Sequence, residues 1–125
     1  MAITDFDSRR TAVFLAGLMG LAGVASAAAA AHGGGQDAHL LQAASALCLA
    51  HAPALIALAA LWDRLRMAAI ASLLMAAGTA LFAGDMTMRH VAGHGLFPMA
   101  APTGGFAIMA GWLAVSVGAL LPRKG

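Results

Sequence analysis

The sequence predicts an all-α membrane protein: a bundle of four transmembrane helices, with the N-terminus and the C-terminus both cytoplasmic. Of its 125 residues, 62% are hydrophobic and only 10% are charged, whereas about 25% of a soluble domain is charged. The charged residues also gather between four apolar stretches, at residues 11–31, 38–62, 67–84 and 103–121. A bilayer core needs roughly 20 apolar residues per helix, and little chain is left over. We therefore expect residues 1–125 to form a single membrane domain.

The first stretch contains no charged residue and is rich in alanine and glycine. It also has two features of a secretory signal, because Arg9 and Arg10 precede it and Ala25-Ser26-Ala27 resembles a cleavage site. The apolar run nevertheless extends well beyond the roughly 7–15 residues of a signal core. We interpret it as a retained span, with cleavage as the alternative.

The connections place the other three stretches. Asp63-Arg64-Leu65-Arg66 is short enough to make the second and third stretches antiparallel neighbours. Pro53 removes one helix donor in the second stretch and predicts a kink there. Residues 85–102 are the longest connection, and their glycines and prolines predict an irregular segment.

Small residues recur every fourth position in the first and last stretches, which places them on one helix face. Such faces let helix backbones approach closely in a membrane. We expect them to pack the bundle, or to bind a membrane-protein partner or a second copy of the chain; the residues are Ala16, Gly20, Ala110, Ala114 and Gly118.

Basic residues predict the orientation. With four spans, the N-terminus, the second connection and the C-terminus share one side, which carries Arg9, Arg10, Arg64, Arg66, Arg123 and Lys124. The other side carries only Arg89. Because basic residues stay in the cytoplasm, both termini are expected inside. The basic residues form no clustered face, which argues against binding to nucleic acid.

Histidines and carboxylates gather in the two predicted outer connections. Imidazole and carboxylate together suit zinc or copper, so these residues are weak candidates for a metal site; they are His32, His39, His90, His94, Asp37 and Asp85. Spacing places His90 and His94 on one helix face, although Gly93 and Gly95 disfavour a helix there. The alternative is a set of ordinary polar residues at the headgroup boundary. Asp85 and Arg89 are also spaced to form an exposed ion pair.

His51 is different because it lies near the middle of the second stretch. A neutral imidazole at that depth needs a hydrogen-bond partner. The functional interpretations are a proton relay, a quinone contact or a haem ligand, and the structural one is a buried histidine bonded to a carbonyl or hydroxyl. A bis-histidine haem is disfavoured because the other stretches have no histidine at that depth. Gln42 should face away from His51 on an ideal helix.

Several short motifs occur in order: Ala31-His32-Gly33, Gln42 followed by His51-Ala52, Leu81-Phe82-Ala83-Gly84, Pro102-Thr103-Gly104-Gly105 and Ala110-Gly111-Trp112. The set resembles domain-of-unknown-function family 423, whose animal relatives are the transmembrane protein 256 group. The resemblance implies four transmembrane helices in an inner membrane and no known activity. It marks His32, Gln42, His51, Gly84, Pro102, Gly104, Gly105 and Trp112 as motif positions. Asp85 and Met86 stand where the family has serine and leucine, and the chain lacks the tyrosine that the family carries in its second span.

No catalytic residue and no cofactor is predicted, because the sequence contains no nucleophile elbow, phosphate loop or paired-cysteine site. The leading hypothesis is a non-enzymatic accessory subunit or packing partner of a membrane complex. The alternative is a homo-oligomeric carrier or channel with His51 lining the path. A membrane enzyme that uses the outer histidines and aspartates is a third hypothesis.

Overall fold

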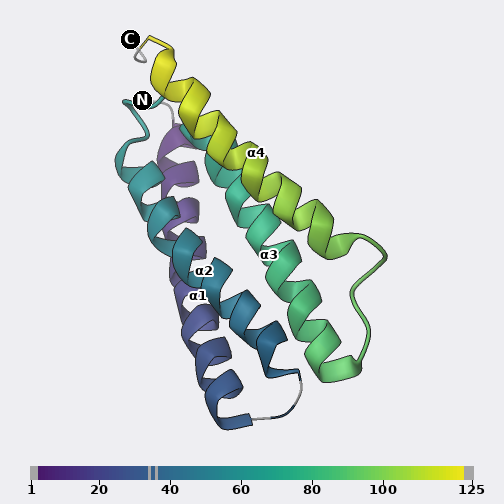
Figure 1. Ribbon diagram of the computed structural model, residues 1–125. Helices are drawn as coiled ribbons and strands as arrows, with labels where there is room; N and C mark the ends of the chain where they lie inside the picture. The colour runs from purple at the N-terminus through teal and green to yellow at the C-terminus, as the bar shows by residue number, and fades with distance from the viewer. Residues whose placement is uncertain (1–2, 34, 36, 123–125) are drawn as a thin grey trace.

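The computed structural model describes residues 3–33, 35 and 37–122 and contains four α-helices, drawn in Figure 1. They are α1 (Ile3–Gly33), α2 (Ala38–Ala60), α3 (Ala68–Ala92) and α4 (Ala100–Leu120). All four are long and apolar enough to cross a membrane. The shortest, α4, has 21 residues, which reaches the roughly 20 that a bilayer core requires. The four predicted helices are therefore present.

The third helix is longer than the sequence predicts. It continues to Ala92, past the predicted end at residue 84, although the added residues include Asp85 and Arg89. These polar side chains bond within the helix, since Arg89 pairs with Asp85 one turn earlier. The helix ends where Gly93 adopts a left-handed conformation with a φ of 80°, which glycine tolerates and other residues avoid.

The connection between α3 and α4 is correspondingly shorter than predicted. Residues 100–102 are not part of it but form the first turn of α4. Pro102 fits there because the first-turn N–H groups of a helix have no partner within the helix.

Each helix packs mainly against its neighbours in the chain. α1 lies against α2, α2 against α3 and α3 against α4, with a slighter contact between α1 and α3. Among the residues that the structure describes, no Cα of α4 lies within 8 Å of a Cα of α1 or α2. Figure 1 shows the start of α1 and the end of α4 at the same end of the molecule. The four helices thus form an open arrangement in which α4 leans on α3.

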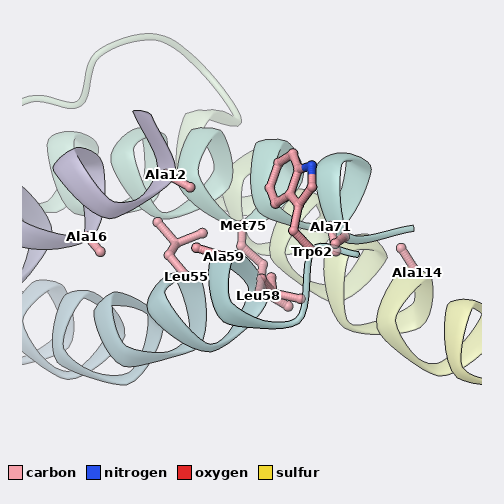
Figure 2. Close-up of a cluster of buried hydrophobic side chains, with 10 residues drawn as sticks. Ala12, Ala16, Leu55, Leu58, Ala59, Trp62, Ala71, Met75 and Ala114 are labelled. Carbon is pink, nitrogen blue, oxygen red and sulfur yellow. The ribbon is translucent and has the colours of Figure 1, made fainter. Parts of the chain in front are cut away.

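The main apolar core lies toward the end of the molecule that holds the start of α1. Leu55, Leu58 and Trp62 of α2 and its following turn pack with Met75 of α3, around the small side chains of α1 and α4 (Figure 2). Ala12 and Ala16 of α1 are buried in this cluster, and Ala16 belongs to the predicted face of small residues. Alanine is needed here because a larger side chain would separate α1 from α2.

Glycines bring α3 and α4 into close contact. A Cβ atom on Gly78 of α3 would lie 2.6 Å from the carbonyl oxygen of Gly104, and one on Gly104 would lie 2.7 Å from that of Gly78. Gly111 and Gly118 continue the contact toward the other end of α4. The packing face of α4 therefore repeats every seventh residue, as in left-handed helix pairs. Of the predicted four-residue repeat on α4, Ala114 and Gly118 are buried and Ala110 is exposed.

Candidate functional site

The most distinctive polar contact within the helices joins His51 of α2 to Trp112 of α4. The His51 side chain is buried, with 4% of its surface exposed. Its Nε2 accepts a hydrogen bond of 3.0 Å from the indole Nε1–H of Trp112. Its Nδ1 lies 2.8 Å from the carbonyl oxygen of Leu47, one turn earlier in α2. Both ring nitrogens are thus engaged.

This geometry selects one form of the imidazole. An indole N–H can only donate, so Nε2 of His51 must accept and carries no proton. The proton of the neutral ring then lies on Nδ1, which donates to the Leu47 carbonyl. Neither nitrogen has a lone pair left for a haem iron. A proton added at Nε2 would replace the bond from Trp112.

The bond also has a structural effect, because it crosses between helices whose backbones do not meet. His51 and Trp112 are 61 residues apart in sequence, and each lies near the middle of its helix. Their rings lie 5.7 Å apart between centroids, at an interplanar angle of 57°. Trp112 remains 46% exposed. The pair therefore fastens α4 to α2 at mid-length.

Gln42, as predicted, does not share this environment. Its side chain is exposed on α2, whereas His51 is buried. A second polar link in the helix interiors was not anticipated: the Ser45 hydroxyl donates to the carbonyl of Gly23 at 2.7 Å and ties α2 to α1. The sequence feature that could have indicated this link is Ser45 itself, a hydroxyl residue three positions after Gln42 in an otherwise apolar stretch.

A second polar cluster lies at the end of α3. Asp85 is fully buried and accepts two hydrogen bonds of 2.8 Å, from Nε of Arg89 and from the backbone N–H of Leu96. Gly95 lies against the pair, and a Cβ there would collide with the carboxylate oxygen of Asp85. The predicted pairing with Arg89 is confirmed, but only Arg89 is exposed as expected, whereas Asp85 is buried. Asp85 instead fastens the 93–99 connection to α3.

The candidate metal ligands do not converge in the described part of the chain, where no group of three or more His, Cys, Asp or Glu side chains could hold an ion. Asp85 is already engaged by Arg89 and Leu96. His94 lies beyond the end of α3, with its Nδ1 2.9 Å from the carbonyl of Gly95. His32, Asp37 and His39 are exposed around the connection from α1 to α2.

Two buried hydroxyls on α3 escaped the sequence reasoning. Ser72 is 6% exposed and Thr79 is fully buried. Neither hydroxyl oxygen has a hydrogen-bond partner among the residues that the structure describes. They lie seven positions apart, and thus nearly on one face of the helix. The spacing of Ser72 and Thr79 in the sequence could have indicated a polar face on this helix.

A family model described as a protein of unknown function (DUF423) matches residues 26–105 of the chain. The chain belongs to the DUF423 family. No curated protein and no solved structure matches it. The matched part of this DUF423 chain includes the end of α1, the whole of α2 and α3 and the start of α4. It contains His51 and Asp85 and ends before Trp112.

The motif positions of this DUF423 chain fall into two groups. Gly84 and Gly104 permit close packing: a Cβ on Gly84 would lie 3.4 Å from Leu96, and Gly104 contacts α3 directly. His51 and Trp112 bond to each other. The other group lies away from these contacts: Gly105 would accept a Cβ without a neighbour within 4 Å, and His32, Gln42 and Pro102 are exposed.

Proposed function

We propose that this DUF423 protein is a small integral protein of the bacterial inner membrane, acting without catalysis as an accessory subunit or packing partner of a larger membrane complex. The observation that carries the proposal is that buried polar groups of the helices form hydrogen bonds within the chain. His51 bonds to Trp112, Ser45 to the carbonyl of Gly23, and Asp85 to Arg89 and Leu96. These bonds join helix to helix or helix to connection, which suits a scaffold.

The exposed surface of α4 supports the proposal that a partner protein binds there. Among the described residues, the backbone of this helix lies close only to that of α3. It presents large apolar side chains elsewhere; those of Phe106, Met109, Leu113 and Leu120 are 63% to 87% exposed. Ala110 lies exposed among them and leaves room for a close helix approach. A membrane-spanning helix of a larger subunit would fit beside it.

The proposed orientation puts both termini in the cytoplasm. Six of the seven Lys and Arg residues lie on the side that contains the termini and the connection between α2 and α3. Arg9 at the start of α1 pairs with Asp63 in that connection, at 3.0 Å, in agreement with one shared side.

The alternative, a homo-oligomeric carrier with His51 along the path, fits this geometry less well. A relay needs an imidazole nitrogen that faces the path, and both nitrogens of His51 bond within the chain. Replacement of His51 by Ala in a liposome flux assay tests it. A carrier predicts flux that the substitution reduces, whereas an accessory subunit predicts no flux from either protein.

Native mass spectrometry of gently solubilised, endogenously expressed protein tests the accessory role. We expect a stoichiometric assembly with a larger membrane protein. Ala110→Phe should reduce that assembly, while Ala50→Phe, at an exposed position on α2, should leave it intact. A homo-oligomer free of other proteins would contradict the proposal and favour the carrier.

A further inference from the structure

A continuous crevice runs between α1 and α3, the two helices that contact each other only slightly. It consists of two cavities of about 410 Å³ and 590 Å³ that share Leu15, Leu73 and Ala76 on their walls. It extends from Ser8 and Thr11 near the start of α1 to Ser26 and Thr87 near the opposite end. From Ser72 to Thr87 the α3 wall alone is about 22 Å long, at 1.5 Å per residue. Each volume lies within the range of small-molecule sites.

The crevice opens sideways, toward the surrounding membrane. Leu18 of α1 and Leu73 of α3 line it and are 48% and 69% exposed. A molecule dissolved in the bilayer could therefore enter without crossing water. The remaining walls are mostly alanine and other apolar side chains, so the occupant must be largely apolar along its length.

The two unpartnered hydroxyls lie in these walls. Ser72 lines the smaller cavity and Thr79 the larger, and both are more than nine-tenths buried. Other hydroxyls in the same helices behave differently: Thr11 and Thr87 donate to the carbonyl four residues earlier. Buried hydroxyls are normally bonded, so the donors of Ser72 and Thr79 point to an acceptor supplied by a ligand.

The depth of Thr79 limits the identity of that ligand. Thr79 lies near the middle of the 25-residue helix α3, and thus near the centre of the bilayer. The ester carbonyls of a phospholipid stay in the interfacial region, far from this depth. A helix of another protein cannot enter the crevice either. Cα atoms of α1 and α3 approach within 8 Å of each other, whereas a third helix between them would need its axis about 8–10 Å from the axis of each.

We propose that the crevice binds a lipid-soluble carbonyl compound with a long apolar tail, the chemistry of isoprenoid quinones. The Thr79 hydroxyl donates to a carbonyl oxygen of the ligand head, Ser72 offers a second donor two turns away, and the tail lies along the alanine-rich walls. This binding is separate from the accessory role: the crevice is formed by α1 and α3, with Cys48 and Leu55 of α2 and the following Trp62 also in its walls, whereas the proposed partner surface is on α4.

Tryptophan fluorescence in phosphatidylcholine nanodiscs provides the test, with decylubiquinone as the probe. Trp62 lines the smaller cavity and is 3% exposed, so a bound quinone should quench it in a saturable way. Trp112, which faces the lipid, adds only an unsaturable baseline. Ala80→Phe and Ala22→Phe fill the larger cavity from its two walls, at exposed positions. Ala50→Phe lines neither cavity and is the control.

We expect saturable quenching in the wild type and in Ala50→Phe, and its loss in both crevice variants. Thr79→Val keeps the shape but removes the donor, and should weaken apparent binding by about 3- to 10-fold. Equal quenching in all variants would overturn the proposal. Loss in the crevice variants without any effect of Thr79→Val would assign the crevice to a plain hydrocarbon chain and overturn the carbonyl. If Ala80→Phe fails to fold by circular dichroism, Ala22→Phe decides. Failure of this test would not change the assembly that we expect in native mass spectrometry.

Discussion

His51 shows how a single polar residue can organise the middle of an apolar structure. Its two hydrogen bonds are mutually dependent, since the proton on Nδ1 that serves Leu47 leaves Nε2 free to accept from Trp112. A buried imidazole without partners would be costly in the low dielectric of the helix interior. The indole of Trp112 removes that cost and links α4 to α2.

Replacement of Trp112 by Phe should expose this dependence. The change removes the donor and leaves Nε2 of buried His51 unsatisfied, which costs about 1–3 kcal/mol of unfolding free energy. The double variant His51→Leu/Trp112→Phe removes both partners and should recover part of that loss. Denaturant titration of the wild type, His51→Leu, Trp112→Phe and the double variant gives the coupling energy. Additive effects of the two substitutions would show that the bond contributes nothing.

The burial of His51 could be predicted from its position in an apolar stretch, but its partner could not. Trp112 lies 61 residues away, on a helix that is not a backbone neighbour of α2. Hydropathy reports how deep a residue lies, and it carries no information on which faces of two distant helices meet. The same limit applies to Asp85, whose burial depends on the Leu96 N–H across the connection.

The two ion pairs offer a second test at the residue scale, because they differ in burial. Asp85 is fully buried beside Arg89, whereas the Asp63 side chain beside Arg9 is 61% exposed. Arg89→Met would leave the buried carboxylate with only the Leu96 N–H as partner and should cost about 1–3 kcal/mol. Arg9→Met should cost only about 0–1 kcal/mol. Thermal unfolding in one detergent compares them, and similar losses would contradict the buried position of Asp85.

At the scale of the helices, the contact between α3 and α4 depends on the absence of side chains. Gly78 and Gly104 each face the other's carbonyl oxygen, so the two backbones touch over one turn. Such contacts favour dispersion and weak Cα–H···O interactions in a membrane, where the hydrophobic effect does not drive helices together. The four helices themselves could be predicted from composition. The position at which α3 ends could not be predicted. The short polar segment that includes Asp85 and Arg89 resembles a connection in the sequence, and only the ion pair between these two residues shows that it is helical.

Gly104→Ala and Gly105→Ala form a matched pair of substitutions on this helix. A Cβ at position 104 would lie 2.7 Å from the carbonyl oxygen of Gly78 and 2.8 Å from the backbone nitrogen of Phe82, and backbone atoms cannot move aside. We expect a loss of about 1–3 kcal/mol from overpacking. A Cβ at position 105 meets nothing within 4 Å, so alanine should stabilise the helix by about 0.5–1 kcal/mol. Denaturation midpoints would rank them, and equal midpoints would exclude the close contact.

At the scale of the whole molecule, an even number of spanning helices puts the two ends of the chain on one side. Because we propose that this side is the cytoplasm, a reporter enzyme active only outside the cytoplasm should be inactive when fused after Gly125. The same reporter inserted after His94, in the connection between α3 and α4, should be active. Activity at both positions would mean that one of the four helices does not cross the membrane.

The sequential packing of the helices also bears on how the chain is assembled during synthesis. Because α1 contacts α2, α2 contacts α3 and α3 contacts α4, each helix finds its main neighbour as soon as the next one leaves the ribosome. Little of the structure has to wait for distant segments, which favours rapid folding and limits the time that unpaired surfaces are exposed. The bond between Trp112 and His51 joins helices that are not consecutive. It can form only after α4 has been inserted, when the first three helices are already in place.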